Sequence, residues 1–337
     1  MRITIKDVAK EAGVSITSVS LVLNGNYDKV SETTRERIIE VANRLKYRPN
    51  HIAMSMVKKT TKTIGLILPD ISNIYFSELA KQIEQECYRH GYNMLYGNTQ
   101  DSAIRDIEYI NIFLDRNVDA IIMILSNTIN EHLKEIESIV RNTDTPILTL
   151  DRNIPIKDCI TVLVNQKLGG YMATKHLIDL GHVSIGCISG PLNIFSAVER
   201  LEGYKEALVE SDIPVREELI YEGDYHRESG MRALPALLGR GVTAIFACND
   251  MMALGVYKQA GNYNISIPQD LSIIGYDDIF IADYLIPPLS SIAQPSEKLA
   301  TVVVEQALMA IEDRMHKGNT LMFDPILMLR GSTRSIK

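Results

Sequence analysis

Apolar and polar residues alternate with a helical period through the first 45 residues of the chain. Ile5, Val8, Ala9 and Ala12 recur at three- and four-residue spacing, so they share one face of a helix. Gly13 interrupts the pattern, and glycine is favoured where a helix stops. The pattern therefore predicts a short first helix that ends in a tight turn.

A second helical pattern follows this turn at once. Ser15 stands where an N-cap belongs, with a hydroxyl able to accept a backbone N–H of the next turn. Val19, Val22 and Leu23 face inward, and Asn24-Gly25 ends the helix. Two short helices joined by a tight turn form a helix-turn-helix, whose second helix has the size that fits a DNA major groove.

The exposed side of this second helix carries small hydroxyl side chains. A solvated helix ordinarily presents Glu and Lys there, whereas this one presents Ser15, Thr17, Ser18 and Ser20. The alternative is a helical hairpin in an ordinary core, since amphipathic helix pairs are common. Charge favours DNA: residues 1–59 hold 11 Lys+Arg against 6 Asp+Glu, a net charge of +5, and the rest of the chain carries −12.

A third helix and a linker complete this N-terminal part. Ser31 caps the helix, and "YRPN" at residues 47–50 ends it. The stretch "HIAMSMVKKTTK", residues 51–62, is too short to hold a core, so we interpret it as a linker with a conditional helical turn. The third helix has a broad apolar face made of Ile38, Ile39, Val41, Ala42 and Leu45.

From residue 63 onward, short apolar runs alternate with amphipathic helical segments. This alternation is typical of βαβ units around parallel sheets. Eight or more strands over about 270 residues divide better into two sheets, and we expect a final helix at about 295–317 to return to the first lobe. Two lobes joined by several chain crossings form a clamp around a cleft. The strand candidates are "TIGLILPD", "YNMLYGN", "DAIIMIL", "TPILTLD", "CITVLVN", "VSIGCISG", "TAIFACND" and "LSIIGYDD", and the helical segments include 77–90, 103–116, 166–180 and 196–210.

Polar residues stand at or just after the carboxyl ends of these strands, where ligands bind in open α/β sheets. Each one taken singly has the simpler interpretation of a helix cap, but several of them converging on one cleft favour a ligand site. Tyr75-Phe76 adds an aromatic pair suited to one face of a ring-shaped solute. The strand-end residues are Pro69-Asp70, Ser126, Asp151-Arg152, Ser189, Asn249-Asp250 and Asp277-Asp278.

Composition narrows the classes of protein further. No apolar run approaches the roughly 18 residues of a membrane span. The N-terminus lacks the apolar region of a secretory signal, and four scattered cysteines favour reduced thiols, so we expect a cytoplasmic protein with no membrane partner. The histidines form no ligand cluster, and no GxSxG elbow or phosphate-cradling glycine loop is present. We therefore expect neither an enzyme nor a cofactor or metal site.

Several longer segments match one known pattern. In the N-terminal part these are "TIKDVAKEAGVSITSVSLVLNG", "VSETTRERI" and "YRPN", and in the body they are "TIGLILPDISNIYFSEL", "ERLEGYKEAL", "ACNDMMALG", "LSIIGYDD" and "PPLSSIAQP". With these segments the whole chain resembles the LacI/GalR family of bacterial transcription regulators. The resemblance implies an α/β fold, with an N-terminal helix-turn-helix three-helix head and a two-lobed periplasmic-binding-protein-like core of two parallel sheets.

The same resemblance implies a division of the chain into three parts. Residues 1–48 are the DNA-binding head, residues 49–61 are a linker with a hinge helix, and residues 62–337 are an effector-binding and dimerisation core. Within the core, lobe 1 is expected at about 62–160 and 293–323, and lobe 2 at about 161–292 and 324–337.

By position, the resemblance assigns contacts with the DNA major groove to the second helix. Leu21 stands where the family commonly has arginine. Leucine cannot make the bidentate contact of arginine with guanine, so we expect a different operator base there. The base-reading positions are Ile16, Thr17 and Leu21, and the neighbouring contacts are Ser15, Ser18 and Ser20.

In the linker, the resemblance assigns contacts with the DNA minor groove to Ala53, Met54 and Met56. Met56 replaces the family's leucine wedge, and methionine is an accepted wedge between base steps. Met54 stands where the family commonly has arginine. The alternative for both methionines is a contact with the other hinge or with the core.

For the effector, the resemblance points to a set of polar and aromatic residues around the cleft. Amide and charged groups that bridge adjacent hydroxyls, with aromatic rings over the apolar face, suit a sugar or polyol. The family's purine-binding members have an arginine where this chain has Ile194, which disfavours a purine. The alternative for Arg152 and Asp277 is a salt bridge across an empty cleft. The expected effector residues are Asn73, Tyr75, Phe76, Arg152, Tyr225, Asn249, Asp277 and Gln294.

These features together predict a homodimeric repressor that binds palindromic operator DNA and responds to a small effector, most simply a carbohydrate. Two alternatives remain. The same architecture could respond to a nucleobase or to a protein co-repressor, or the chain could be a sugar-binding receptor with no DNA role. The receptor alternative leaves residues 1–60 unexplained.

Overall fold

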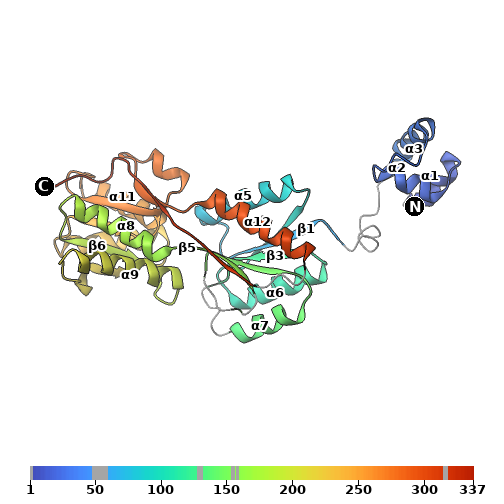
Figure 1. The fold of residues 1–337 in the computed structure, drawn as a ribbon. Coiled ribbons are helices and arrows are strands. Elements are labelled where there is room, and N and C mark those ends of the chain that lie inside the picture. Colours follow the sequence, from blue (N-terminus) through green and yellow to red (C-terminus); the bar gives the residue numbers. More distant parts are fainter. Residues whose placement is uncertain (1–2, 48–59, 127–131, 153–155, 157–158, 314–317) are drawn as a thin grey trace. The chain divides into compact units, whose positions relative to one another are not determined.

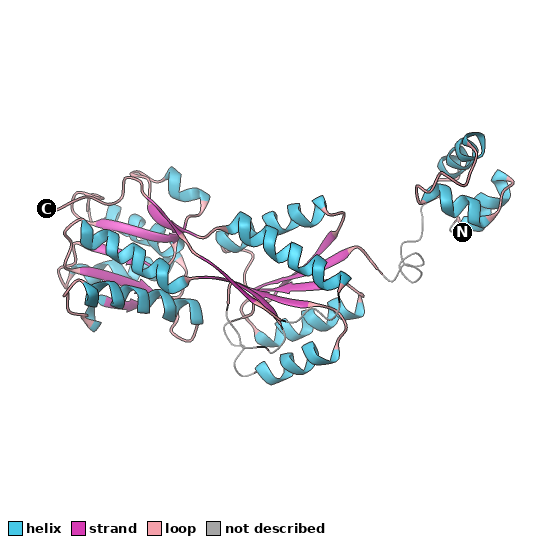
Figure 2. Ribbon diagram, in the orientation of Figure 1, coloured by secondary structure: helices cyan, strands magenta, loops and turns pink. Residues whose placement is uncertain are grey.

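The computed structural model describes residues 3–47, 60–126, 132–152, 156, 159–313 and 318–337. The chain divides into two compact units, Met1–Thr61 and Lys62–Lys337, and each is described here by itself. The division falls where the sequence predicts the start of the core. Figure 1 shows the order of the elements along the chain, and Figure 2 separates the helices from the strands.

The N-terminal unit contains three short helices with the predicted caps. Ser15 accepts a hydrogen bond from Ser18 N, Ser31 accepts one from Thr34 N, and Gly13 is left-handed with φ of 62°. The predicted apolar residues form one buried cluster, except that Ile39 is exposed. Ile39 lies one position after the buried Ile38, a rotation of about 100° around the helix. The helices are α1 (Ile5–Ala12), α2 (Ile16–Leu23) and α3 (Glu32–Arg44).

The first sheet of the second unit has six parallel strands in the order β11-β5-β4-β3-β1-β2. Successive strand residues point to opposite faces, so Leu66 packs under two helices on one face and Ile67 under two others on the opposite face. The strands are β1 (Thr63–Leu68), β2 (Asn93–Asn98), β3 (Ala120–Met123), β4 (Ile147–Leu150), β5 (Ile160–Val164) and β11 (Thr320–Phe323). The helices are α5 (Ile74–Arg89) and α12 (Ser296–Glu312) on one face, and α6 (Ala103–Asp115) and α7 (Leu133–Asn142) on the other (Figure 1).

The second sheet has the order β12-β10-β9-β8-β6-β7 and is parallel except for β12, which runs antiparallel to β10. Its apolar residues and those of its helices form one buried cluster. The strands are β6 (Ile185–Ser189), β7 (Ile220–Glu222), β8 (Ala244–Ala247), β9 (Ser272–Asp277), β10 (Ser290–Ala293) and β12 (Ile326–Met328). The helices are α8 (Gln166–Asp179), α9 (Phe195–Glu210), α10 (Arg227–Leu238) and α11 (Asp250–Asn262), with short 3-10 turns at Glu217–Leu219 and Phe280–Tyr284.

Two details of the predicted core need correction. The lobe boundary was expected at residue 160, but β5 pairs with β4 and β11 and so belongs to the first sheet; the chain first crosses between the lobes at Asn165. The pairing is reinforced by a hydrogen bond from Thr149 to Thr161 at 2.9 Å. The second sheet was expected to be parallel throughout, and its edge strand β12 is not. The final helix packs on the first lobe as predicted, as α12 against α5 and β3.

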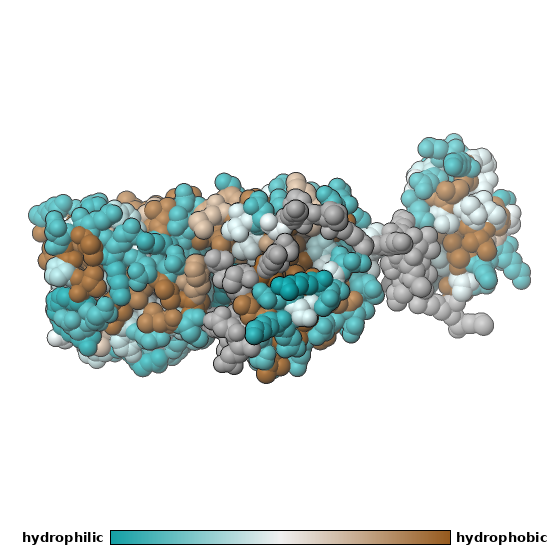
Figure 3. Space-filling view, turned by 60° about the horizontal axis from the view of Figure 1, so that its bottom comes forward, coloured by the Kyte–Doolittle hydropathy of each residue, from teal (hydrophilic) through white to brown (hydrophobic). Residues whose placement is uncertain are grey.

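The surface of the core mixes polar and apolar groups. On the face seen in Figure 3, apolar residues form separate patches between polar ones. Among the described helices, none combines the length and the apolar character needed to span a bilayer.

Candidate functional site

A cavity of about 420 Å³ opens at the carboxyl ends of the strands of both sheets. Asp70 follows β1, Asp151 follows β4, Asn249 follows β8, and Asp277 ends β9. This is the edge at which open α/β sheets bind ligands. The cavity is lined by Asp70, Ser72, Asn73, Tyr75, Phe76, Gln100, Asp101, Asp151, Arg152, Ser196, Arg200, Asp224, Tyr225, His226, Asn249, Met251 and Asp277.

Of the eight predicted effector residues, the structure brings seven to the wall of this cavity. The exception is Gln294, which is buried behind Asp277 and donates its Nε2 to Asp277 Oδ1 at 2.8 Å. Gln294 lines a neighbouring cavity of about 400 Å³ instead, together with Tyr75 and Asp277.

Some of these residues also cap helices, as the simpler interpretation held. Asn73 accepts a hydrogen bond from Tyr75 N at the start of α5. Asn249 accepts one from Met252 N at the start of α11 and donates its Nδ2 to the carbonyl of Tyr225. Capping fixes the orientation of both amides at the cavity wall, so the two roles are compatible.

The predicted alternative of a salt bridge between Arg152 and Asp277 is wrong, because the structure gives each a different partner. Arg152 pairs with Asp101 at 3.1 Å and donates to the carbonyl of Leu125. Asp277 pairs with Arg200 at 3.6 Å.

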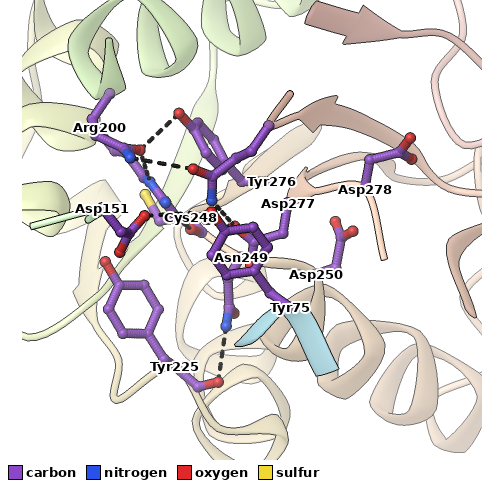
Figure 4. Close-up of polar contacts among 12 residues, drawn as sticks. Tyr75, Asp151, Arg200, Tyr225, Cys248, Asn249, Asp250, Tyr276, Asp277 and Asp278 are labelled. Atoms are coloured by element: carbon purple, nitrogen blue, oxygen red, sulfur yellow. Dashed lines mark hydrogen bonds and ion pairs between the residues drawn. The ribbon is translucent and has the colours of Figure 1, made fainter. Parts of the chain in front are cut away.

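Arg200 is the main cleft residue that the sequence analysis missed. It projects from α9 and is 4% exposed. Its Nε donates to Gln166, its Nη1 donates to the carbonyl of Cys248, and its guanidinium lies 3.6 Å from the ring centre of Tyr276. Figure 4 shows it facing Asp151 and Asp277. Its only signal in the sequence is the segment "ERLEGYKEAL", where it sits within a regular helical pattern.

Several cavity residues have backbones that side chains rarely adopt. The φ angles are positive at Gln100, Asp101, Asp151, Tyr225 and Asp277, with values of 54°, 57°, 69°, 65° and 101°. Such conformations persist only where the surroundings hold them, and they gather at ligand sites. They turn the side chains at the strand ends toward one space.

Buried carboxylates dominate the electrostatics of the cavity. Burial raises the pKa of Asp277 to about 7, although Arg200 and the amide of Gln294 oppose the shift. Burial also raises the pKa of Asp151, whose carboxylate, among the residues that the structure describes, accepts one long hydrogen bond of 3.5 Å from the Tyr75 hydroxyl. The phenol of Tyr225 is buried without a hydrogen-bond partner among the described residues. The cavity therefore offers acceptors that a ligand with several donors satisfies.

The raised pKa of Asp277 predicts a pH-dependent stability. Because the folded pKa of about 7 exceeds the ordinary value of 3.8, the folded state holds an extra proton between these values. The free energy of unfolding is then expected to fall as the pH rises from about 4 to about 7, by up to about 1.4 kcal/mol per pH unit, and to level off above.

Urea unfolding of the wild type and of Asp277→Asn between pH 5 and 8 measures this slope. The asparagine variant is expected to show a flatter profile, with the remaining slope coming from Asp151 and from Asp250, whose pKa is also raised by burial. Identical slopes in the two proteins would show that Asp277 is ionised throughout the range.

In the N-terminal unit, the predicted DNA-contacting residues lie around α2 on the sides away from the buried Val19 and Val22. Ser15, Ile16 and Thr17 are exposed, with Ile16 45% exposed, whereas Ser18, Ser20 and Leu21 are half-buried. An exposed isoleucine next to two hydroxyl side chains gives this end of α2 an apolar and hydrogen-bonding surface without charge. The predicted linker contacts Ala53, Met54 and Met56 lie outside the described residues.

The comparisons with known proteins agree with this two-part construction. Residues 4–50 match the model described as bacterial regulatory proteins, lacI family, and residues 174–333 match a periplasmic binding protein-like domain. The chain is 34% identical over 335 residues to the HTH-type transcriptional repressor PurR of Vibrio campbellii, covering 99% of each chain.

Solved structures agree as well. The lac repressor dimer bound to operator and the anti-inducer ONPF has a TM-score of 0.87 and 27% identity, covering 99% of this chain and 100% of that one. A LacI family regulator from Enterococcus faecium with bound ribose has a TM-score of 0.74 and 30% identity, covering 82% and 100%. The chain belongs to the LacI/GalR family of bacterial regulators and is a DNA-binding transcriptional repressor of that family.

Proposed function

We propose that this repressor binds a palindromic operator as a homodimer and that a sugar or polyol in the cleft controls its affinity for the operator. The observation that carries the effector class is the pair of buried carboxylates Asp151 and Asp277. Within the described part of the chain, Asp151 has one long hydrogen bond, and Asp277 has one amide donor and Arg200. A carboxylate accepts hydrogen bonds from two adjacent hydroxyls, which a polyol supplies.

The aromatic residues of the cavity support the same ligand class. Tyr75, Phe76 and Tyr225 line the wall beside the carboxylates. Aromatic rings cover the apolar C–H face of a sugar ring while polar groups bind its hydroxyls. The regulator from Enterococcus faecium with bound ribose is similar over 82% of this chain.

A nucleobase is the second candidate effector, favoured by the 34% identity to the repressor named PurR. A flat base could lie against the aromatic residues and donate its N–H groups to Asp151 and Asp277. Ile194, where the purine-binding members have arginine, is 3% exposed and does not line the cavity. The cavity therefore lacks an arginine at position 194, and its lining arginines are Arg152 and Arg200.

For DNA, we propose that α2 reads the major groove through Ser15, Ile16, Thr17, Ser18, Ser20 and Leu21. Ile16 and Leu21 favour contact with thymine methyl groups, and the hydroxyls favour base edges or phosphates. Ala53, Met54 and Met56 are proposed for the minor groove on the family resemblance alone.

A homodimer is supported by the similarity to the lac repressor dimer and by an apolar surface on the core. Phe280, Tyr284 and Ile286 are 59%, 79% and 94% exposed. Exposed apolar groups that gather in this way mark a protein interface.

A two-step experiment on the full-length protein tests the proposal. Fluorescence anisotropy with DNA from upstream of its own gene, against a scrambled duplex, is expected to show specific binding that weakens steeply with salt. A thermal-shift panel of D-ribose, xylitol, hypoxanthine and adenine then identifies the ligand class, because a bound ligand raises the melting temperature. A shift with hypoxanthine or adenine alone would favour the nucleobase, and equal affinity for both duplexes would contradict the operator assignment.

A further inference from the structure

Within the described residues, the polypeptide passes between the two lobes at three places. Asn165 and Gln166, at the first crossing, contact the other two crossings. Asn165 and Gln166 stand where β5 leads into α8, and Gln294 stands where β10 leads into α12. Asn165 donates its Nδ2 to Asp324 Oδ1 at 3.1 Å and its backbone N–H to the carbonyl of Phe323 at 2.8 Å, both at the third crossing. Gln166 contacts the second crossing through Gln294.

Gln166 also joins these crossings to the charged residues of the cleft. Its Oε1 accepts hydrogen bonds from Arg200 Nε and from the Tyr276 hydroxyl, each at 2.8 Å. Its Nε2 donates to Gln294 Oε1 at 3.4 Å, and Gln294 Nε2 donates to Asp277 Oδ1 at 2.8 Å. Arg200, Tyr276 and Asp277, which Figure 4 shows converging on one place, are thus the ends of one hydrogen-bonded chain.

The donor-to-acceptor direction of this hydrogen-bonded chain is fixed at both ends. Arginine has only donors, so the oxygen of the Gln166 amide must face Arg200. The Gln166 nitrogen then faces Gln294 and requires its oxygen, which leaves the Gln294 nitrogen for Asp277. Above pH 7, where Asp277 is ionised, its carboxylate has only acceptors, so this arrangement satisfies all four groups. Reversing one amide would create an acceptor–acceptor contact.

The two amides are also largely buried. Gln166 is 2% exposed and Gln294 is 5% exposed. A buried polar group that loses its partner is destabilised because no water replaces the lost hydrogen bond. A change in the hydrogen bonding of Arg200 or Asp277 therefore alters the hydrogen bonds at the crossings, because solvent does not compensate for it.

We propose that Gln166 is a positioning residue that couples occupancy of the cleft to the arrangement of the lobe crossings through Gln294. The proposal rests on the proposed function, in which an effector binds Asp277, whose partner Arg200 lines the same cavity. A hydroxyl that donates to Asp277 or accepts from Arg200 changes the hydrogen bonding at one end of the chain. The amides respond, and the crossing segments that carry them move with them.

The first test uses full-length protein without effector at about pH 8, above the pKa of about 7 of Asp277, so that its carboxylate is ionised. Gln166→Glu keeps the acceptor for Arg200 and Tyr276 but replaces the donor to Gln294 by an acceptor. The Gln294 amide must then reverse, and its oxygen meets Asp277. We expect the melting temperature to fall by several degrees, and we expect Asp277→Asn, which supplies an N–H donor for the reversed amide, to restore at least half of the loss.

A background variant separates this restoration from simple charge compensation at Arg200. Gln294→Leu breaks the hydrogen-bonded chain, so in this background Asp277→Asn is expected to restore none of the melting temperature that Gln166→Glu loses. Gln269→Glu is the matched control, because Gln269 is exposed and remote from the cavity lining. Its melting temperature is expected to equal that of the wild type. Additive effects of Gln166→Glu and Asp277→Asn, or a restoration that persists with Gln294→Leu, would overturn the proposal.

The second test measures communication with DNA, using whichever of D-ribose, xylitol, hypoxanthine and adenine raises the wild-type melting temperature. The factor by which that compound changes operator affinity is typically about 5–150-fold in allosteric proteins. The factor by which the compound changes operator affinity is expected to approach one in Gln166→Glu and to stay at the wild-type value in Gln269→Glu. A wild-type factor in Gln166→Glu overturns the coupling role. Failure of all four compounds to bind counts against the proposed effector classes, and the melting-temperature comparison still decides the role of Gln166.

Discussion

An Arg200→Leu protein is expected to lose about 3–5 kcal/mol of stability, the cost of breaking a buried ion pair from one side. Arg200 is the cation that lies against the buried carboxylate of Asp277, at 3.6 Å. The substitution also leaves the carbonyl of Cys248 and the amide of Gln166 without this donor. Part of the cost is offset when Asp277 takes up a proton, because the pKa of Asp277 is already raised to about 7.

The same substitution is expected to abolish effector binding, because the cavity loses its guanidinium. Urea unfolding measures the stability and calorimetry measures effector affinity. Arg200→Lys is the informative companion: it keeps the charge but lacks the planar fork that bonds Gln166 and Cys248 together. We expect lysine to recover part of the stability and little of the affinity. Wild-type stability in Arg200→Leu would contradict the picture of a buried charge pair at the cleft.

A Gly170→Ala protein is expected to be destabilised by about 3 kcal/mol or more, at the upper end of the overpacking range. Gly170 lies on α8, and a Cβ added there would stand 2.0 Å from the backbone carbonyl oxygen of Arg200 on α9. A backbone atom cannot turn away as a side chain does, so the two helices must separate. Their separation also moves Gln166 on α8 away from Arg200 on α9, so effector affinity is expected to fall as well.

Gly261→Ala is the matched control for this prediction. Gly261 is also helical, in α11, but an added Cβ there has nothing within 4 Å. Alanine has a higher helix propensity than glycine, so this variant is expected to gain up to about 1 kcal/mol. Urea unfolding of the two variants therefore gives shifts of opposite sign. Similar shifts would mean that the close approach of α8 and α9 is not what requires glycine at position 170.

Local patterns in the sequence were sufficient to predict the head and most of the core. The helices of the head follow from three-residue and four-residue apolar spacing together with caps at Ser15 and Ser31, and these signals act within one turn. Seven of the eight predicted strands are largely apolar, because a parallel strand buried on both faces needs few polar residues. The eighth, β2, is a partly exposed edge strand. The strand-end positions of Asp151, Asn249 and Asp277 follow from the same runs.

The strands β7, β10, β11 and β12 escaped prediction because each has only three or four residues; β7, β11 and β12 lie at sheet edges. Pairing with a neighbour that is distant in sequence, such as β11 with β5, makes them strands. Long-range strand pairing also explains the misplaced lobe boundary, because an apolar run predicts a strand but does not indicate which sheet the strand joins. Sheet membership is decided by long-range packing.

The sequence by itself determined the class of this protein: a helix-turn-helix head, a linker, and a two-lobed α/β core with polar residues at its strand ends. Only the tertiary structure decided which charges meet in the cleft. Arg200 and Gln166 lie in ordinary helical patterns, and nothing local marks them as different from solvated residues. Arg200 becomes a cleft residue, with Gln166 buried against it, because α8 and α9 approach closely at Gly170. Arg200 then lies beside Asp277, where a buried charge is stable only with a partner.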